Sequence, residues 1–536
     1  MNTKKMDDSL FNVYTDPEFS DKIEDPYVIN SAKPIYLEFN EKLDMNTIAD
    51  GIKVFNIKSD FKEYEVEIKI TTKDNTTNIL QICGKDNRKF SEGELYKLYI
   101  DKNVRSISGA ALNEDFISYF AVNYSFNLDS SGITALNNER NMIICISDLH
   151  LGANDAYAEL TENREHLINF LKYIKNSPNV KELVIVGDLI DEWFIPMNLN
   201  TFNGKTQAEF VKSVASNNKS VFEAFNTIIQ EGNVKVTYVP GNHDILINTD
   251  DIESILPGIS QARDVKGLGA YVPEDFPELV IEHGHRYNFY CAPDYSNRSI
   301  TNTDSILPPG YFFTRMATSS VLEGRPKIDM SIPVVNKNEL GNDQYLYFLY
   351  YSVWKTLISD FPVQEGLDAK VINTGIDGFN DFYSLKDVLP YQDSETGYID
   401  TNLYHSIIES WEDRQDENLV QMKIATDEAI LKGTLASHLD DQSNVQFFNN
   451  QDSDKKIVVF GHSHEARLIT SIKNKNVKNV YANSGTWIDK CQHPTMTFVT
   501  ITPSKTGNPS PTYVGLYQYV SEGEIKELNS QAMINL

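Results

Sequence analysis

The chain contains few cysteines, and their positions follow no recurrent spacing. Its 536 residues include four, with no Cys-x-x-Cys pair: Cys83, Cys145, Cys291 and Cys491. Such scattered thiols argue against a disulfide framework and against a thiolate zinc site. No uncharged apolar run approaches the roughly 18 residues that a transmembrane helix requires, and the two lysines near the start precede no apolar stretch. The sequence therefore predicts no transmembrane segment, no signal peptide and, by default, a cytoplasmic location.

Positive charge is also scarce. Lysine and arginine together number 48 against 76 aspartates and glutamates, which gives a formal net charge of −28 and a pI near 4.8. A polyanion would be repelled over most of such a surface, so we expect no nucleic-acid footprint. A small anion could still bind in one cleft, because divalent cations would reverse the local potential there.

Hydrophobic residues make up 41% of the chain, and its length favours two or three domains. From residue 25 to 126, short β-rich runs alternate with polar turns. The segment Tyr64–Ile70 alternates apolar and polar side chains, which is typical of a strand with one buried face. We expect strands at residues 35–39, 52–55, 64–70, 79–82, 95–100 and 116–124. This pattern predicts a β-sandwich, followed by a polar linker over residues 127–140.

The next region contains five polar motifs, each directly after a short apolar run. The runs are Met142–Ile146, Leu183–Val186, Val234–Val239, Leu279–Ile281 and Ile457–Phe460. The motifs are Asp148-Leu149-His150, Gly187-Asp188 with Asp191, Gly241-Asn242-His243-Asp244, His283-Gly284-His285 and Gly461-His462-Ser463-His464. Runs of this kind are typical of buried strands, and open α/β sheets bind ligands beyond the carboxyl ends of their strands.

Helix and strand patterns alternate between the motifs, as βαβ units require. Apolar residues share one face in residues 162–175 and again in residues 208–229, which predicts a helix over each. The segment of residues 286–456 is much longer than an ordinary loop, so we expect it to form a cap or lid. Within it we expect helices over residues 345–358 and 401–439. Strands are expected again at residues 480–483, 496–501 and 513–520.

The five motifs in this order resemble the calcineurin-like metallophosphoesterase superfamily. The strings Ser147–Gly152 and Gly187–Trp193 are similar to the branch that includes UDP-2,3-diacylglucosamine pyrophosphatases, although that branch usually has Arg at the position of His243. The stretch Pro34–Phe39, with the acidic turn after it, resembles a bacterial Ig-like domain. The resemblances imply a multidomain chain: an all-β Ig-like sandwich (25–126), then an α/β/β/α metallophosphoesterase sandwich (141–285 and 457–520) with a large, mainly helical insertion (286–456).

The same resemblance implies roles for individual residues. Asp148, His150 and His464 would hold one metal ion, Asn242, His283 and His462 a second, and Asp188 would bridge the two. His243 would protonate the leaving oxygen, with Asp191 orienting its ring. In the fourth motif either His283 or His285 could be the ligand, and the family pattern favours the first. Asp244 either braces its turn or supports His243.

Mixed imidazole, carboxylate and amide ligands favour Mn, Fe or Zn over Mg or Ca, and we favour Mn. Arg286, at the start of the insertion, is a candidate for gripping a substrate phosphate, because guanidinium groups bind phosphate oxygens in pairs.

The sequence thus predicts a metal-dependent hydrolase that cleaves a phosphate ester or pyrophosphate bond of a small phosphorylated substrate. Attack would come from a hydroxide that bridges two divalent metal ions. No Gly-x-Ser-x-Gly motif suggests a serine nucleophile instead. The alternative is a non-catalytic scaffold that keeps this fold and binds a protein partner through the Ig-like domain. Ligand positions alone do not separate monoester, diester and pyrophosphate substrates.

Overall fold

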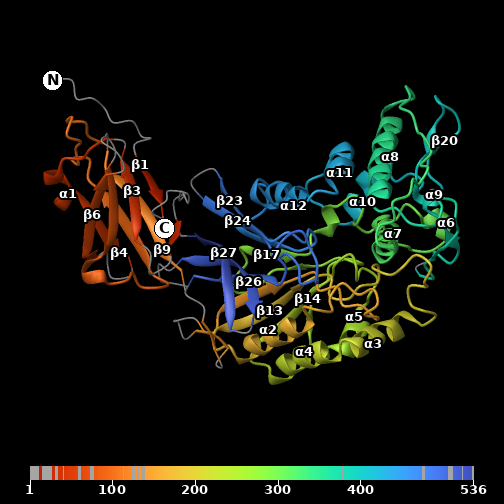
Figure 1. Cartoon of the computed structure of the whole chain (residues 1–536), viewed down its shortest axis with the longest axis horizontal. Helices are drawn as coiled ribbons and strands as arrows, with labels where there is room; N and C mark the ends of the chain where they lie inside the picture. Colours follow the sequence, from red (N-terminus) through yellow and green to blue (C-terminus); the bar gives the residue numbers. More distant parts are fainter. Residues whose placement is uncertain are drawn as a thin grey trace.

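The computed structural model describes residues 11–14, 27–29 and 34–533, except for residues 40, 58–61, 73–77, 113, 124–126, 130–131, 135–138, 377, 474–476, 505–510 and 522. Strands of the N-terminal region lie at one end of the molecule and the helices of residues 286–456 at the other, with two sheets between them (Figure 1). Within the described residues, no helix is both long enough and apolar enough to cross a membrane.

The N-terminal region consists of strands in two sheets, ordered β1-β3-β7-β6 and β2-β9-β8-β4-β5. The elements are β1 (Phe11–Tyr14), β2 (Tyr27–Ile29), β3 (Ile35–Phe39), α1 (Met45–Gly51), β4 (Ile52–Asn56), β5 (Lys62–Tyr64), β6 (Val66–Thr72), β7 (Asn78–Gly84), η1 (Lys85–Asn87), β8 (Leu95–Ile100) and β9 (Phe116–Val122). Buried and half-buried side chains alternate along β3 and β4. Apolar residues from both sheets form one hydrophobic cluster, so the sheets share a core. The region is mostly β, as predicted, and its Ig-like character stays a prediction.

The prediction of a single strand over residues 64–70 is wrong. The chain leaves one sheet and enters the other at Glu65, since β5 pairs with β4 whereas β6 pairs with β7. The carbonyl of Glu65 accepts a hydrogen bond from the backbone N–H of Lys85 at this break. The alternation of apolar and polar residues continues through the change of sheet, which is why the sequence does not reveal it.

The predicted linker contains regular structure in its described part. β10 (Asn127–Asp129) and β11 (Gly132–Thr134) pair antiparallel as a short hairpin. The predicted end of the second region, residue 520, is also too early. A further strand, β27 (Glu524–Met533), pairs with β26 (Thr512–Ser521) along nearly its whole length.

Two sheets form the centre of the second region. The seven-stranded sheet has the order β15-β14-β13-β12-β25-β26-β27, and the five-stranded sheet the order β16-β17-β22-β24-β23. Their remaining strands are β12 (Met142–Ile146), β13 (Val180–Val186), β14 (Lys235–Val239), β15 (Ser260–Gln261), β16 (Ala270–Tyr271), β17 (Leu279–Glu282), β22 (Ile457–Phe460), β23 (Arg467–Lys473), β24 (Val477–Asn483) and β25 (Thr497–Thr502). The expected strands are therefore present with shifts of a few residues at their ends.

Both faces of strand β12 are buried, in two different layers. Ile143 and Cys145 belong to the hydrophobic cluster that also contains residues of β17, β22 and β24, so this face packs on the five-stranded sheet. Ile144 and Ile146 belong to the cluster that contains the helices of the opposite side. Because successive side chains of a strand point to opposite faces, a strand buried on both sides needs a continuous apolar run. Burial of both faces of the strand explains why each of the five motifs follows a continuous apolar run.

Helices cover the outer face of the seven-stranded sheet. Against the seven-stranded sheet lie α2 (Arg164–Asn176), α3 (Gln207–Asn217), α4 (Lys219–Glu231) and α5 (Thr249–Ile255) (Figure 1). The single helix expected over residues 208–229 is two helices, because the chain breaks at Asn218. The Asn218 side-chain amide donates to the carbonyls of Gly152 and Val214, which ties the break to the loop after the first motif.

Residues 286–456 contain several short elements and two longer helices. They are η2 (His285–Tyr287), α6 (Arg298–Thr301), α7 (Gly310–Leu322), α8 (Asn342–Asp360), β18 (Ile372–Asn373), β19 (Phe382–Tyr383), α9 (Leu385–Val388), β20 (Tyr391–Gln392), β21 (Ile399–Asp400), α10 (Trp411–Glu417), α11 (Thr426–Lys432), α12 (Ser437–Gln442) and η3 (Ser443–Phe448). Helix α8 matches the expected aromatic helix. The long helix expected over residues 401–439 is wrong, because left-handed backbone at Leu419 and a turn at Gly433 separate α10, α11 and α12.

The N-terminal region contacts the far edge of the seven-stranded sheet. The side-chain amide of Asn123 donates to Tyr517 Oη at 3.3 Å and to Glu527 Oε2 at 3.0 Å. Tyr513 Oη donates to the carbonyl of Val122 at 3.0 Å. A small hydrophobic cluster of Leu95, Ala121, Tyr513 and Ala532, with Ile57, closes this contact. Strands β26 and β27 thus connect the two regions.

Candidate metal centre

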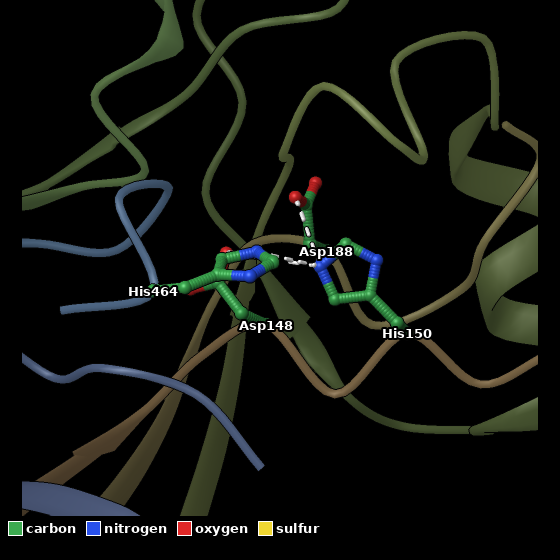
Figure 2. A group of neighbouring side chains, drawn as sticks. All are labelled: Asp148, His150, Asp188 and His464. Atoms are coloured by element: carbon green, nitrogen blue, oxygen red, sulfur yellow. Dashed lines mark hydrogen bonds and ion pairs between the residues drawn. The ribbon is translucent and has the colours of Figure 1, made fainter. Parts of the chain in front are cut away.

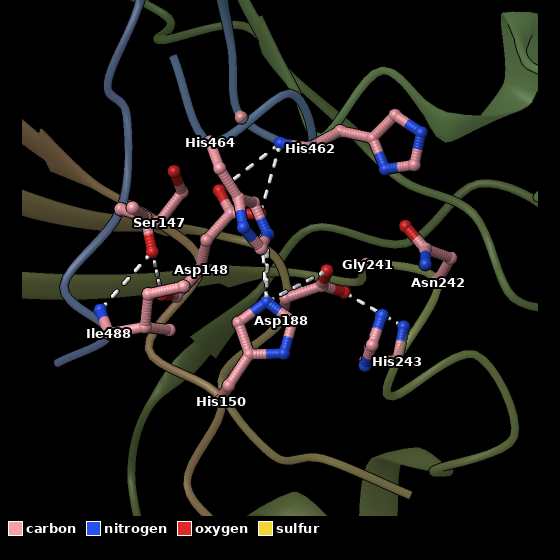
Figure 3. Close-up of polar contacts among 12 residues, drawn as sticks. Ser147, Asp148, His150, Asp188, Gly241, Asn242, His243, His462, His464 and Ile488 are labelled. Atoms are coloured by element: carbon pink, nitrogen blue, oxygen red, sulfur yellow. Dashed lines mark hydrogen bonds and ion pairs between the residues drawn. The ribbon is translucent and has the colours of Figure 1, made fainter. Parts of the chain in front are cut away.

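The polar motifs of both sheets meet at one place. Strands β12, β13 and β14 run parallel, as do β17 and β22, so their carboxyl ends lie at the same edges of the two packed sheets. Asp148, Asp188 and Asn242 follow the first three strands, and His283 and His462 follow the other two. Figure 3 shows Asp148, Asn242 and His462 gathered around Asp188. The polar residues of the five motifs, which are far apart in the sequence, therefore lie together in one cluster.

The backbone is strained at this cluster. Among non-glycine residues with positive φ are Asp148 (54°), His150 (46°), Asp188 (52°), His462 (69°) and His464 (58°). Side chains with a Cβ rarely adopt this left-handed region, and such residues concentrate at functional sites because the surrounding fold must hold them there. Five strained positions in one cluster indicate that the loops are built to aim these side chains.

Two motif glycines make room for the cluster. A Cβ on Gly187 would collide with the ring of His283, and a Cβ on Gly241 would collide with the backbone and carboxylate of Asp188. The glycine of each motif is thus needed by a side chain from another motif.

The first group of side chains comprises Asp148, His150, Asp188 and His464 (Figure 2). His150 Nε2 lies 3.1 Å from His464 Nε2, 3.6 Å from Asp188 Oδ2 and 3.8 Å from Asp148 Oδ1. His464 Nε2 lies 3.2 Å from Asp148 Oδ1. The first three are completely buried or nearly so, and His464 is half-buried.

The second group comprises Asp188, His283 and His462, with Asn242 beside them. His283 Nε2 lies 3.2 Å from Asp188 Oδ2 and 3.1 Å from Asn242 Oδ1. Asp188 Oδ2 is therefore close to a histidine of each group, which places this one oxygen between them. His462 Nε2 lies 3.0 Å from the side-chain amide nitrogen of Asn288.

The proton positions show that these groups suit a cation. His283 Nδ1 must donate to the carbonyl of Val186, 2.7 Å away, so in the neutral ring Nε2 carries a lone pair. That lone pair faces the oxygens of Asp188 and Asn242. His150 Nδ1 donates to Asp191 Oδ2 at 3.0 Å, and its Nε2 likewise faces acceptors. Two donors that share one ion at about 2.1 Å lie roughly 3.0–3.4 Å apart, close to the separations seen here. The donor set thus fits divalent metal ions.

Without a bound cation, electrostatic interactions within the cluster keep Asp188 ionised and His283 protonated, so a cation that binds at His283 Nε2 would displace a proton. Burial acts to raise the pKa of Asp188, but the charges of His283 and His243 hold it well below its ordinary value, so this carboxyl is ionised. Burial acts to lower the pKa of His283, whereas the Asp188 carboxylate raises it to about 9. Burial, together with the charge of His283, lowers the pKa of His462 to about 3, so its ring is a neutral lone-pair donor.

His243 lies next to the cluster, on the side of the cleft. Its Nδ1 donates to Asp191 Oδ1 at 2.8 Å, which leaves Nε2 available, and the side chain keeps an exposed fraction of 12%. The same Asp191 carboxylate accepts from His150 through its other oxygen. Asp191 is itself fixed by the backbone N–H groups of Trp193 and Phe194, at 2.8 and 2.7 Å. One carboxylate therefore orients both imidazoles.

Residues 142–319 match the model of the calcineurin-like phosphoesterase family. The matched segment contains the first four motifs, and the fifth, with His462 and His464, lies beyond its end. The cluster thus combines residues of a calcineurin-like phosphoesterase domain with residues that follow the insertion.

Similarity to solved structures is weak. The N-terminal part of the bacterial S-layer protein SbsC is 15% identical over 24% of this chain and 27% of that chain, with a TM-score of 0.16. Chitinase ChiW from Paenibacillus sp. str. FPU-7, a cell-surface-expressed enzyme, is 9% identical over 46% of this chain and 20% of that chain, with a TM-score of 0.18. This chain thus spans about a quarter or less of their lengths, and these overlaps carry no functional information. No curated protein matches the chain.

Two sequence alternatives have structural answers. His285 lies outside both groups: its Nε2 donates to the carbonyl of Gly267 at 2.9 Å, so His283 is the residue of this motif that joins the cluster. Asp244 braces its turn, because its two oxygens accept from the backbone N–H groups of Gly241 at 2.6 Å and Leu189 at 2.9 Å. Burial and the nearby Asp188 charge raise the pKa of Asp244 to about 6.

The structure corrects the prediction that Arg286 binds substrate. Its guanidinium pairs with Asp264 and, at 2.9 Å, with Glu282, and it donates to the carbonyl of Asn418. The side chain is 5% exposed and does not line the cleft beside the metal cluster. Arg286 instead joins the start of the insertion to the domain below it.

Three further residues support the cluster without belonging to a motif. Glu159 Oε2 lies 3.4 Å from His150 Nδ1, Trp193 stacks on His243 with ring centroids 4.8 Å apart, and Asn288 contacts His462. Glu159 and Asn288 follow no recognisable spacing, and only tertiary contact reveals them. Trp193 is easier to identify from the sequence, because it is the last residue of the string that begins at Gly187.

Glu192 provides a test of the packing behind the cluster. It is fully buried, its Oε1 accepts from Gln207, and its Oε2 has no partner among the described residues. Burial raises its pKa from 4.5 to about 8, with smaller contributions from Asp244, Asp251 and Asp191. Between these two pH values the unfolded chain releases a proton that the folded chain keeps, so stability falls as pH rises.

We expect Glu192→Gln to raise the melting temperature, with a gain that grows from pH 5 to pH 8 and reaches on the order of a few kcal/mol. Thermal unfolding at several pH values measures this. Glu209→Gln is the control, since Glu209 is a fully exposed helix-capping residue whose pKa is lowered. A gain that is the same at both pH values would contradict the burial of an ionisable carboxyl.

Proposed function

We propose that this protein is a metal-dependent hydrolase that cleaves a phosphate ester or pyrophosphate bond. The observation that carries the proposal is the convergence of seven side chains on one centre, with Asp188 Oδ2 close to a histidine of each group. The match of residues 142–319 to the calcineurin-like phosphoesterase family also supports it.

One ion would be held by Asp148, His150 and His464. The other ion would be held by Asn242, His283 and His462, and Asp188 would contact both ions. The separations of 3.1–3.8 Å within the first group, and of 3.1–3.2 Å from His283 Nε2 to the oxygens of Asn242 and Asp188, support this division. His462 belongs to the same candidate group as His283 and Asp188. The donors are nitrogen and oxygen without thiolate, which suits Mn, Fe or Zn, and we favour Mn. Two such ions, when bound, would supply a nucleophilic water at neutral pH and neutralise charge on the phosphoryl oxygens.

The protein's own residues handle the leaving group. When the bond between phosphorus and the leaving oxygen breaks, that oxygen gains negative charge and needs a proton. His243 Nε2 would supply it, because Nδ1 is held by Asp191 and the ring borders the cleft. Water supplies the oxygen that replaces the leaving group on phosphorus, and His243 recovers its proton from solvent. Asp191 acts as a positioning residue for both His243 and His150.

The scaffold alternative is less well supported. A non-catalytic protein has no need to keep strained ligand loops, yet all seven ligand positions and the acid position are filled by suitable side chains. A partner-binding role for the N-terminal β region, with an Ig-like fold, is compatible with either function.

We expect the metal-free protein to be inactive and Mn²⁺ to restore hydrolysis. A panel of p-nitrophenyl phosphate, bis-p-nitrophenyl phosphate and nucleoside diphosphate derivatives then identifies the bond type, and elemental analysis gives the metal content. Turnover that survives complete chelation would contradict the proposal. Failure of every substrate after verified loading with two equivalents of metal would favour the scaffold.

A further inference from the structure

A cleft of about 430 Å³ opens beside the metal cluster, a volume typical of small-molecule sites. One side is formed by Asp188, Asn242, His243, His462 and His464. The rest of the cleft wall consists mostly of apolar and aromatic residues, with the polar Asn288, Thr314 and Thr434 among them. The apolar and aromatic residues, most of them from the insertion, are Trp193, Tyr290, Cys291, Phe313, Trp354 and Leu357. A substrate whose phosphoryl group sits at the cluster must place its remaining atoms against this wall.

Among the residues that the structure describes, no lysine or arginine lines the cleft. Two arginines of the insertion, Arg315 and Arg414, bind other groups of the protein. Arg315 is fully buried and donates to the carbonyls of Ile195 and Pro196, among others. Arg414 pairs with Asp294 at 2.8 Å and donates to the carbonyl of Phe289. A second phosphate group would therefore meet apolar surface and uncharged side chains such as Asn288, Thr314 and Thr434, with no lysine or arginine to neutralise it, which is less favourable.

The apolar wall begins at the proposed proton donor. Trp193 stacks on His243 with an interplanar angle of 29°. Gly310, the first residue of α7, lets this helix approach closely, because a Cβ there would lie 2.7 Å from the carbonyl oxygen of Tyr290 and 3.4 Å from the Trp193 ring. Helix α7 then carries Phe313 into the lining of the cleft. If the leaving oxygen of a bound ester lies at His243, the organic group attached to that oxygen would thus contact the apolar wall directly.

We propose that the substrate is a phosphate ester whose organic part is uncharged and apolar, and that the apolar surface of Phe313 and Leu357, backed by the buried rings of Trp193 and Trp354, selects it over polyphosphates. This inference rests on the proposed hydrolase function and adds its substrate class. The selection follows from the burial of apolar area, since each methylene buried in such a site strengthens binding roughly fourfold.

Linear alkyl phosphates test this directly, because ethyl, butyl and hexyl phosphate have nearly the same leaving-group acidity and differ in apolar area. With the Mn²⁺-loaded protein, kcat/KM should rise roughly fourfold per methylene until the wall is covered. Inorganic pyrophosphate should be the poorer substrate. Binding of the matching alkylphosphonates, which cannot be hydrolysed, should show the same trend in tryptophan fluorescence, since Trp193 and Trp354 line the cleft.

Phe313→Ala should flatten the chain-length trend in both measurements. Phe348→Ala is the matched control, since Phe348 is also half-buried on a neighbouring helix but lies outside the lining, and it should keep the trend. A flat profile in the unmodified protein, or a preference for pyrophosphate, overturns the substrate class while leaving the hydrolase intact. Absence of turnover for p-nitrophenyl phosphate and its diester overturns the hydrolase itself, and this inference with it.

Discussion

Replacing Asp188 with asparagine is expected to reduce phosphate ester hydrolysis by roughly a thousandfold or more. Asp188 is the residue common to both metal groups, and its carboxyl is held ionised by the histidines around it. The amide loses the negative charge that two cations would share, and metal ions supply several kcal/mol of transition-state stabilisation. Elemental analysis should show fewer than two metal equivalents per chain, and steady-state kinetics with saturating Mn²⁺ should show the loss in kcat.

Asp155→Asn is the control for this variant. Asp155 lies in the same region, pairs with Arg164 at the surface and has no contact with the cluster. It should keep both metal content and activity. An Asp188→Asn protein that retains two ions and full turnover would remove the central support for a shared carboxylate.

Replacing His243 with alanine is expected to lower hydrolysis of esters with poor leaving groups by ~10²–10⁴, the usual contribution of a general acid. The same change should affect p-nitrophenyl phosphate much less, because p-nitrophenolate leaves without a proton. Metal content should stay the same, since the ring contacts the cluster only through Asp191 and the neighbouring imidazole of His150. The ratio of kcat values for an alkyl and a p-nitrophenyl ester isolates this role.

His405→Ala serves as the control, because His405 is half-exposed, pairs with Asp400 and lies far along the insertion. Its kinetics should match those of the unmodified protein. If His243→Ala slows both ester types equally, or loses metal, then His243 is a structural or metal-binding residue and another group donates the proton.

The sequence predicted the cluster well for a physical reason. Each motif follows a strand buried on both faces, and such strands are visible as continuous apolar runs such as Met142–Ile146. Neighbouring parallel strands end at one edge, so the order of the motifs alone predicts that Asp148, Asp188 and Asn242 lie close together. The assignment to a calcineurin-like phosphoesterase domain rests on the same residues.

Other predictions failed where local pattern and tertiary structure differ. The change of sheet at Glu65 leaves the alternation of side chains intact. Arg286 follows a motif, yet it pairs with Asp264 and does not line the cleft. Residues such as Asn288 act through contacts with segments distant in sequence, which no local pattern encodes. The apolar wall was equally hidden, because an aromatic helix such as α8 has the same composition whether it fills a core or lines a cleft.

The spacing of the motifs has a consequence for biogenesis. His150 and His464 meet at 3.1 Å although 314 positions separate them, and the entire insertion lies between the fourth and fifth motifs. During synthesis the chain can gather the first four motifs early, but the last two imidazoles emerge only after the insertion has left the ribosome. Closing so long a loop is slow and entropically costly. A nascent chain would therefore lack His462 and His464, one member of each candidate metal group, until the whole insertion has been synthesised.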